Sequence, residues 1–412
     1  MSGSGGGGEP PGIAPGTPIV LVEPEAGGHH FIPYLLFLAQ LLQARGHPLT
    51  LITTEAAVAH PAMRRLQEEL VAPLRLQMMR APVRQREGVI GLMRRQIDYW
   101  RSLRVAARGM VAPDAVFVVM SADSVDRAIA LLGSPFGGRR FVALFIQLKF
   151  HWPALGIGPG GRLAGLSRLT FLRLLAAPSL LAAASIDASL LESMRGHRHS
   201  RRLHFIPDPG EVQCSLDRAA ARAALGLPDG SFVVLVYGVI DKRKGIPALL
   251  TAAARIPEGL QVVLAGRFGS GYAETLAAYG LEALQAAGSL MLCDRYVDTD
   301  EEGRLFRAAD LVWLGYAPEV NGQSAVLAQA ASAGVPVLGK SAGLIGRTIR
   351  AARLGLTVDP EDPAAVLSAL QRAMTSTAEV LAPGAARFAA ERSAAAYRRA
   401  WTACLFGMGE SE

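Results

Sequence analysis

Short apolar runs alternate with helix-length segments along almost the whole chain, and this alternation constrains the fold more than any other feature. Strands that alternate with helices at this spacing indicate a parallel sheet with helices on its faces. In the first half, the runs predicted as strands are 18–22, 49–53, 115–120, 140–146 and 203–206. In the second half they are 232–237, 260–265, 290–293, 311–314, 335–338 and 356–358. The chain is therefore predicted to be an α/β protein with one parallel sheet in each half.

The length of 412 residues exceeds what one hydrophobic core usually holds, so two domains are expected. Pro207, Pro209 and Gly210 interrupt the pattern between the two series of runs and mark the boundary. A final helix is predicted over 385–405 and is expected to pack across both domains. The predicted divisions are a flexible tail over 1–17, an N-terminal domain over 18–208, a C-terminal domain over 209–378 and the last segment over 379–412.

Composition limits the classes of partner. The net charge is +7, but the basic residues are spread along the chain. A nucleic-acid-binding face normally concentrates its positive charge, so we expect anionic small ligands or an anionic membrane surface, and no nucleic acid. The three cysteines are widely spaced without metal-ligand spacing, which is typical of a reduced, cytoplasmic protein.

Neither a signal peptide nor a membrane-spanning helix is expected from the sequence. Its glycine-rich start lacks the apolar core of a signal peptide. The most apolar stretch, 163–191, is interrupted by two arginines, a proline and an aspartate, so it is not a membrane-spanning helix. We therefore expect a cytoplasmic protein.

A long helical segment between Met63 and Met110 is rich in arginine. Mixed with leucine, methionine and Trp100, these arginines suit an amphipathic surface that lies on an anionic bilayer, at the inner membrane face. A solvated helix face whose arginine stems cover apolar neighbours is the more usual explanation of such a pattern. The sequence leaves both interpretations open. The arginines are Arg64, Arg65, Arg84, Arg86, Arg94, Arg95, Arg101, Arg104 and Arg108.

The stretch 318–346 is predicted to form a loop, a helix, a turn, a buried strand and a glycine loop. Ser324 is an acceptable N-cap for the strong helix formers of 325–333, and Gly322 frees the backbone just before it. Gly334 suits a left-handed turn that ends the helix. The helix start would present unpaired N–H groups and the positive end of a dipole beside glycines, which is an environment that binds phosphate. An ordinary alanine-rich αβ unit without a ligand explains the stretch equally well.

Three loops of the second half follow predicted strands at their carboxyl ends, so they should line one crevice. The loop GVIDKRKG provides Lys244 beside Gly238, the loop GRFGSG provides Gly266 and Arg267, and the third is the helix start at Ser324. Cations on glycine-bounded loops suit a diphosphate, because they neutralise charge where the backbone can approach it. No Asp-x-Asp constellation accompanies these loops, so no metal or other cofactor is expected.

The first half offers two further candidates. Gly27, Gly28 and His29 follow the first predicted strand as a ligand-facing loop, although histidines at a helix start are more often surface or capping residues. The loop lacks G-x-G-x-x-G, so a dinucleotide site is not indicated. His151 lies in an aromatic loop after the strand predicted over 140–146, at the sheet edge where ligands bind in open α/β proteins.

These motifs resemble those of the retaining glycosyltransferases with the GT-B fold, of the broad family-4 type known as glycosyl transferases group 1. The family's pattern of Gly, five residues, Lys-Gly is met by Gly238, Lys244 and Gly245. Its later signature contains two glutamates that fall here on Asn321 and Gln329, so both carboxylates are replaced by amides. Amides still hydrogen-bond hydroxyl groups but lack charge-assisted strength.

The resemblance implies two Rossmann-like domains that face a cleft, with a C-terminal helix crossing between them. It also implies that Lys244 contacts the diphosphate of a nucleotide sugar, that His151 lies near the reacting sugar, and that Glu319 could substitute for a missing glutamate. The predicted catalytic residues are His151 and Lys244. The predicted donor-binding residues are Gly238, Arg243, Gly266, Arg267, Glu319, Asn321, Gly322, Ser324, Ala325 and Gln329, and the predicted acceptor-side loop is Gly27, Gly28 and His29.

The predicted function is transfer of a sugar from a UDP- or GDP-sugar to a sugar, lipid or small-molecule acceptor held by the N-terminal domain. Retention at the anomeric carbon follows from the resemblance alone. Two alternatives stay open. The amides at Asn321 and Gln329 also suit a catalytically inactive scaffold or a nucleotide-sugar-binding protein. A nucleotide-sugar epimerase would need paired carboxylates near the anomeric carbon, and the amides disfavour it.

Overall fold

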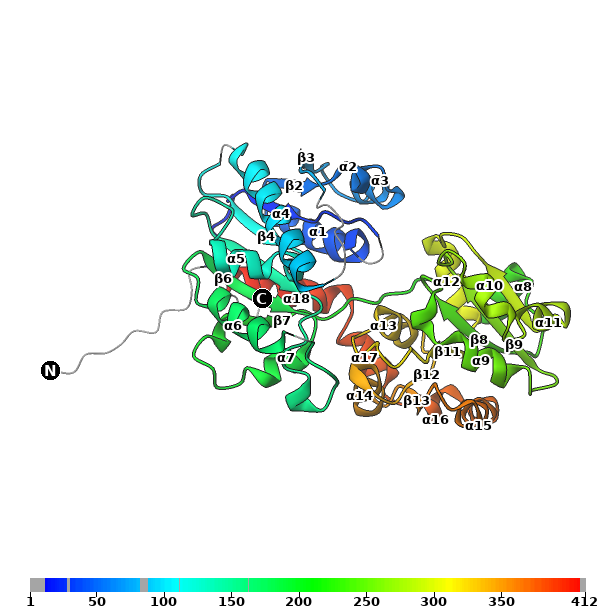
Figure 1. The fold of residues 1–412 in the computed structure, drawn as a ribbon. Coiled ribbons are helices and arrows are strands. Elements are labelled where there is room, and N and C mark those ends of the chain that lie inside the picture. Colours follow the sequence, from blue (N-terminus) through cyan, green and yellow to red (C-terminus); the bar gives the residue numbers. More distant parts are fainter. Residues whose placement is uncertain (1–11, 28–29, 82–87, 111, 162, 408–412) are drawn as a thin grey trace. The chain divides into compact units, whose positions relative to one another are not determined.

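The computed structural model describes residues 12–27, 30–81, 88–110, 112–161 and 163–407, and the chain divides into two compact units. The N-terminal unit comprises Met1–Leu155, Pro159–Pro207 and Ala395–Glu412, and the C-terminal unit comprises Gly156–Gly158 and Asp208–Ala394. Each unit is a parallel sheet between two layers of helices (Figure 1). The predicted α/β class with two Rossmann-like domains is therefore confirmed.

The N-terminal unit contains a seven-stranded sheet in which the recorded pairings are all parallel. The spatial order is β3 (Arg75–Met78), β2 (Leu49–Thr53), β1 (Ile19–Val22), β4 (Val116–Val119), β5 (Phe141–Phe145), β6 (Leu180–Ser185) and β7 (Leu203–Phe205). The central strands IVLV, VFVV and FVALF are buried throughout, as expected for strands covered on both faces. The order of the strands reverses between β1 and β4.

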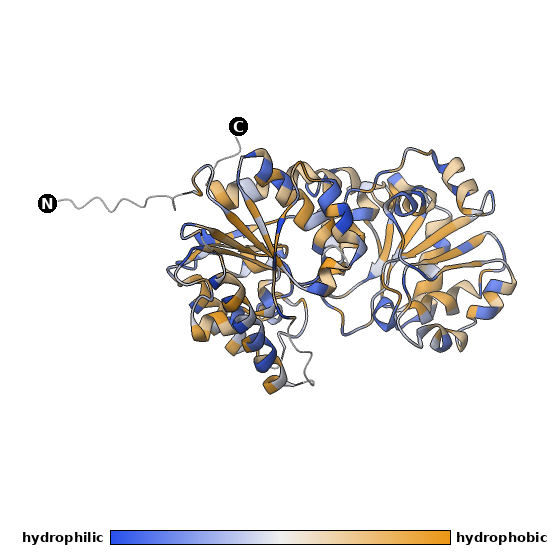
Figure 2. Ribbon diagram, turned by 90° about the horizontal axis from the view of Figure 1, so that it is seen from above, coloured by the Kyte–Doolittle hydropathy of each residue, from blue (hydrophilic) through white to orange (hydrophobic). Residues whose placement is uncertain are grey.

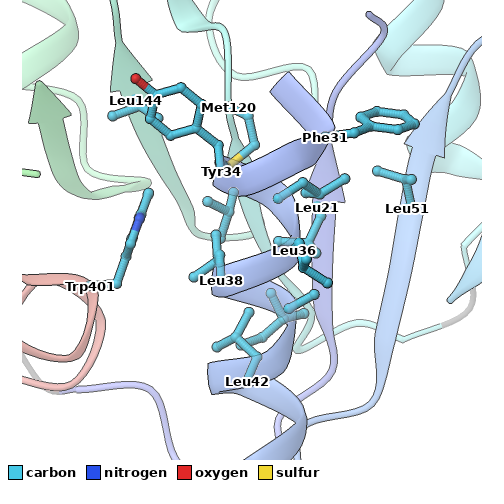
Figure 3. Packing of buried hydrophobic residues seen from close by; sticks show 14 of the residues in the cluster. Leu21, Phe31, Tyr34, Leu36, Leu38, Leu42, Leu51, Met120, Leu144 and Trp401 are labelled. Atoms are coloured by element: carbon cyan, nitrogen blue, oxygen red, sulfur yellow. The ribbon is translucent and has the colours of Figure 1, made fainter. Parts of the chain in front are cut away.

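Helices cover both faces of this sheet, and each face has its own core. On one face, Leu38 of the first helix and Trp401 of the last pack with Leu21 of β1 (Figure 3). On the other face, Tyr99 and Phe171 pack against the opposite side chains of the same strands. The α-helices of the unit are α1 (Leu36–Ala44), α2 (Glu55–Val58), α3 (Pro61–Glu68), α4 (Val89–Arg108), α5 (Asp126–Leu132), α6 (Ala164–Leu175), α7 (Ala188–Ser193) and α18 (Ala394–Phe406), with a π-helix, η1 (His30–Leu35), before α1.

The C-terminal unit contains a six-stranded parallel sheet. Its spatial order is β10 (Leu290–Cys293), β9 (Leu260–Ala265), β8 (Phe232–Tyr237), β11 (Leu311–Leu314), β12 (Val337–Lys340) and β13 (Gly355–Val358). Here the order reverses between β8 and β11. Figure 2 shows the apolar strands at the centre of each unit, with helices of mixed polarity around them.

Two cores again flank the sheet. One face carries α8 (Arg218–Leu225), α12 (Thr299–Ala308), α13 (Ala325–Ser332), α14 (Gly343–Ala352) and α17 (Ala385–Ala390). The other carries α9 (Ile246–Ala253), α10 (Tyr272–Ala277), α11 (Leu281–Ala286), α15 (Pro363–Met374) and α16 (Ala378–Leu381). None of the helices in the described ranges is long and apolar enough to cross a membrane.

The long arginine-rich segment is not one helix. It contains α3, then strand β3 at the edge of the sheet, and then α4, while Arg84 and Arg86 lie outside the described residues. The strand RLQM has no apolar run because it is mostly exposed, so its sequence carries no strand signal.

Three other elements differ from the prediction. Strand β6 was missed because its sequence LLAAAS is rich in alanine, which favours helices. The predicted glycine loop after β12 is instead the start of α14. The helix-length segment 272–287, between two predicted strands, is not one helix but two, α10 and α11, which are separated at Gly280 with φ +83°.

Both ends of the chain pack differently from the prediction. The predicted tail lies outside the described residues up to residue 11, but Ile13 is buried and its N–H donates to the Leu405 carbonyl at 3.1 Å. The helix predicted over 385–405 is broken into α17 and α18. The Glu211 carboxylate accepts the Ala394 N–H at 2.6 Å and so marks the new helix start. Phe388 of α17 then packs in the C-terminal core, and Trp401 of α18 packs in the N-terminal core.

Candidate functional site

The candidate site lies in the C-terminal unit at the carboxyl ends of β8 and β11, where the strand order reverses. In open parallel sheets, the connections on the two sides of such a point leave in opposite directions and open a crevice for ligands. The loop after β8 contains the 3₁₀ turn η5 (Lys242–Lys244), and the loop after β11 leads to α13.

Lys244 and Ser324 meet at this point through the hydroxyl group of Tyr316. The Lys244 side chain is buried, and its Nζ donates to the Tyr237 carbonyl at 2.5 Å and to the Tyr316 hydroxyl at 3.3 Å. The Tyr316 hydroxyl also forms a 2.9 Å hydrogen bond with the Ser324 hydroxyl. An ammonium group has three donors, so one N–H of Lys244 has no acceptor among the described residues and is available to a ligand. The basic loop and the helix start therefore face one place.

Close backbone approach brings the lysine to this position. Gly245 has φ +57°, and a Cβ there would lie 1.9 Å from the Gly315 carbonyl oxygen. Only glycine allows the loop after β8 to touch the loop after β11 in this way. The Trp313 indole N–H donates to the Lys244 carbonyl at 2.8 Å and fixes the same turn.

The loop after β9 joins the site from the other side. Gly266 has φ +134°, and a Cβ there would lie 2.0 Å from the Gly238 carbonyl oxygen. The Ile240 N–H donates to the Arg267 carbonyl at 2.9 Å, and the Arg267 side chain is exposed. The structure thus brings together the two glycine loops that the sequence grouped.

Arg243 faces a carboxylate of its own loop. Its guanidinium binds Asp241, with Nε 2.9 Å from Oδ2. This hydrogen bond, more than the opposing effect of burial, raises the pKa of Arg243 above its ordinary value. The charge of Arg243 is therefore balanced within its own loop, and Lys244 is the buried cation of that loop.

The start of α13 differs in one detail from the expectation. Ser324 is the N-cap residue, with extended backbone, but its side chain does not cap the helix because it binds Tyr316 instead. Gly322 precedes it, and Ala325 is the first helical residue. Gly334 has φ +71° and follows the end of the helix, as predicted.

Lys340 holds the loop before α13 in place through hydrogen bonds, and it was not among the residues predicted from the sequence. It is the last residue of β12 and is buried. Its Nζ donates to the carbonyls of Ala317, Pro318 and Val320 at 3.1, 2.6 and 2.9 Å, and to Asn321 Oδ1 at 3.2 Å. Burial lowers the pKa of Lys340, although Glu319, Asp359 and Glu361 act in the opposite direction.

The two amides at the expected glutamate positions are both used inside the protein. Asn321 is buried, its side-chain oxygen binds Lys340, and its carbonyl accepts the Leu344 N–H at 3.0 Å. Gln329 is buried in α13 and donates from Nε2 to Glu302 at 3.0 Å. The Tyr237 hydroxyl donates to the same Glu302 oxygen, and burial together with Glu302 raises the pKa of Tyr237 well above its ordinary range. Glu319 is exposed in the turn before Asn321.

A carboxylate therefore lies beside Gln329 although the sequence places none at that position. Glu302 belongs to α12, and no spacing rule links it to α13. The oxygen Oε1 of Gln329 is buried without a hydrogen-bond partner among the described residues. Those residues also contain no group of three or more His, Cys, Asp or Glu side chains that could hold a metal ion.

His151 is buried in the N-terminal unit. Its Nε2 lies 3.0 Å from both Asp187 Oδ2 and Ser189 Oγ, and the Trp152 indole donates to the same Asp187 oxygen at 3.1 Å. Burial raises the pKa of Asp187, but the hydrogen bonds from His151, Ser189 and Trp152 together hold it below its ordinary value. A contact between His151 and a sugar stays a prediction. Gly27 is exposed, whereas Gly28 and His29 lie outside the described residues.

Part of the C-terminal unit matches a family of known proteins. Residues 217–388 match the family described as Glycosyl transferases group 1. The D-inositol 3-phosphate glycosyltransferase of Mycolicibacterium vanbaalenii is 35% identical over 156 residues, which are 36% of this chain and 34% of the relative. The enzyme of the same name from Nocardioides sp. is 34% identical over 226 residues, 51% of this chain and 49% of the relative. The matches thus span about a third to a half of these relatives.

Solved structures match over nearly the whole chain. Anabaena HepE in complex with UDP and glucose superposes with a TM-score of 0.67 at 15% identity, covering 95% of this chain and 100% of that one. WaaG, a glycosyltransferase involved in lipopolysaccharide biosynthesis, gives a TM-score of 0.62 at 17% identity, with the same coverage. The C-terminal unit thus carries a region that matches the glycosyl transferases group 1 family, and the chain has the GT-B fold.

Proposed function

We propose that the chain is a glycosyltransferase that moves a sugar from a UDP- or GDP-sugar to an acceptor held by the N-terminal unit. The observation that carries this proposal is the convergence of Lys244 and the start of α13 through Tyr316 at the switch point of the C-terminal sheet. The family matched by residues 217–388 and the similarity to D-inositol 3-phosphate glycosyltransferases support the same reaction class. A neighbour solved with UDP-glucose supports a uridine nucleotide.

The proposed chemistry is stabilisation of the leaving nucleoside diphosphate. As the bond between the anomeric carbon and the diphosphate oxygen breaks, negative charge grows on that oxygen. Lys244 supplies a positive charge there, and the free N–H groups of the first turn of α13 supply the positive end of a dipole. Both are held in place before the substrate arrives, so little reorganisation opposes the reaction. In this proposal the lysine and the helix start neutralise the diphosphate, and no metal is required.

The direct test is a panel of UDP-, GDP- and dTDP-sugars, assayed in the presence of a metal chelator. Polyols and D-inositol 3-phosphate serve as probe acceptors. We expect release of one nucleoside diphosphate with formation of a glycoside, whose anomeric configuration, read by NMR, matches that of the donor. Dependence of the release on an added divalent cation would contradict the metal-free proposal.

A nucleotide-sugar-binding protein without transferase activity is the second candidate. It is favoured by one observation: Asn321 Oδ1 and Gln329 Nε2 are already engaged by Lys340 and Glu302, so each amide has only its other polar atom left for sugar hydroxyls in this conformation. In the same panel, a nucleotide sugar that binds but is never turned over would establish this candidate in place of the transferase.

We also propose peripheral contact between α4 and an anionic membrane. Its exposed surface combines Val89, Ile90 and Val105 with arginines, and both features favour an anionic bilayer. The exposed arginines of α4 are Arg94, Arg95, Arg101, Arg104 and Arg108.

Reversing Arg101, Arg104 and Arg108 to glutamate is expected to weaken co-sedimentation with anionic vesicles by about 100-fold or more, because each basic residue near the surface contributes about 1 kcal/mol. The matched control reverses the exposed Arg255 and Arg372 and the exposed Arg387 of the C-terminal unit. If both triple variants bind the anionic vesicles equally well, α4 is an ordinary solvated helix face.

A further inference from the structure

A second polar cluster lies at the switch point of the N-terminal sheet, between β1 and β4. Glu23 directly follows β1, Ser121 follows β4, and His30 begins the π-helix η1. In a parallel sheet the carboxyl ends at such a reversal border the ligand crevice. The cluster therefore occupies the same place in its sheet as Lys244 and Tyr316 occupy in theirs.

The three side chains form one hydrogen-bonded unit. Glu23 is 1% exposed, and its Oε2 accepts from Ser121 Oγ at 2.8 Å and lies 3.0 Å from His30 Nδ1. A carboxylate only accepts hydrogen bonds, so the ring proton of a neutral His30 is placed on Nδ1. Its Nε2 then carries the lone pair. The side chain is 29% exposed, and none of the described residues hydrogen-bonds Nε2.

Neighbouring groups hold this unit in place. The other Glu23 oxygen accepts the Glu25 N–H at 3.0 Å. The turn after Ser121 is tied to the end of β5, because the Asp123 carboxylate accepts the N–H groups of Ile146 and Gln147 at 2.6 and 3.1 Å. A buried carboxylate that orients an imidazole whose second nitrogen is open is the arrangement of a general base and its orienting partner.

We propose that His30 is the general base for the acceptor hydroxyl, with Glu23 and Ser121 as positioning residues. This inference rests on the proposed glycosyltransferase function. The acceptor oxygen forms a bond to the anomeric carbon on the face from which the diphosphate departs, so the configuration is retained, while the acceptor proton passes to His30 Nε2. The bond from that carbon to the diphosphate breaks, and its electron pair leaves with the nucleoside diphosphate. Glu23 stabilises the imidazolium, which then returns its proton to solvent.

The charges around His30 set the expected pH dependence. Burial lowers the pKa of His30, but the attraction and hydrogen bond of Glu23, with a contribution from Glu25, raise it by more. Arg95 approaches Glu25 to 3.8 Å, and the Tyr99 hydroxyl is buried nearby with a raised pKa. Burial also raises the pKa of Asp123 to about 6. The base works only when neutral, so kcat/KM falls as the pH drops below the pKa of His30.

The test compares His30→Gln, Glu23→Gln and Asp123→Asn in the full chain, with UDP-glucose and D-inositol 3-phosphate as the first probe pair. His30→Gln keeps a donor toward Glu23 but accepts no proton. It is expected to lower kcat by about 100-fold or more and to abolish the acid limb of kcat/KM, with the Kd for UDP unchanged. Glu23→Gln should move the acid limb to lower pH, because the imidazolium loses its partner. Asp123→Asn should leave the limb in place.

Two results would overturn the inference, and they differ in meaning. If His30→Gln loses less than about threefold in kcat or keeps the acid limb, His30 is not the base although the transferase function stands. If the wild-type chain binds UDP but transfers to none of the hydroxyl probes, the transferase proposal fails and the base fails with it. Thermal unfolding and UDP binding confirm in each case that the variant is folded.

Discussion

Replacing Lys244 with alanine is expected to lower kcat for the nucleotide sugar by about 100- to 1000-fold, the loss that follows removal of one well-placed donor to developing negative charge. The lysine is buried, and two of its three donors are already engaged by Tyr237 and Tyr316. Its ammonium group is therefore placed before the substrate binds. A loss of this size in kcat, beyond any change in KM, would show that the charge acts mainly in the transition state.

Lys242 provides a matched control two residues away. It belongs to the same 3₁₀ turn, but its side chain is exposed. Lys242→Ala should change kcat by less than about twofold, because a solvated charge on the surface is largely screened. Because Lys244 is buried, Lys244→Met should be measured beside the alanine variant, since it keeps most of the stem volume. Wild-type kinetics in both Lys244 variants would remove the diphosphate assignment.

The strands could be predicted from the sequence wherever their side chains are mostly buried on both faces of the sheet. The runs predicted over 232–237, 260–265, 290–293 and 311–314 coincide with β8, β9, β10 and β11, because these strands are mostly buried on both faces and so read as uninterrupted apolar runs. Strand β3 is exposed and β6 is rich in alanine, so neither carries that signal. In those two cases, pairing within the sheet overrides the local preference of the sequence.

The candidate site was predictable where spacing alone defined it. Gly238 and Lys244 lie on one loop, and the sequence places that loop at the end of a strand. The side-chain partners could not be predicted in the same way. Tyr316 joins Lys244 to Ser324, and Glu302 joins α12 to Gln329, through contacts set by how separate elements pack. Glu23 and Lys340 are polar residues at the ends of buried apolar runs. This pattern in the sequence would have identified both of them.

Lys340→Met is expected to lower the free energy of unfolding by about 3 kcal/mol, because it leaves four buried or partly buried oxygens without their donor. Three of these oxygens are the carbonyls of Ala317, Pro318 and Val320, and the fourth belongs to Asn321. Methionine fills the space of the lysine stem but donates no hydrogen bond. Denaturant unfolding of the C-terminal transition measures the loss, and Lys242→Met, at an exposed position, is expected to change it by less than about 0.5 kcal/mol.

Lys340→Met also tests whether Lys340 acts by positioning the start of α13 or by contacting the ligand directly. The loop that Lys340 holds runs into Ser324, so a loosened loop displaces the first turn of α13 from the place where Lys244 points. Affinity for UDP should then fall by about tenfold, which corresponds to about 1.4 kcal/mol. Because Lys340 has no ligand contact in this account, adding UDP should recover part of the lost stability. A Lys340→Met variant that unfolds like the wild type would show that water replaces the four hydrogen bonds, and that the helix start is held by Tyr316 and Ser324 alone.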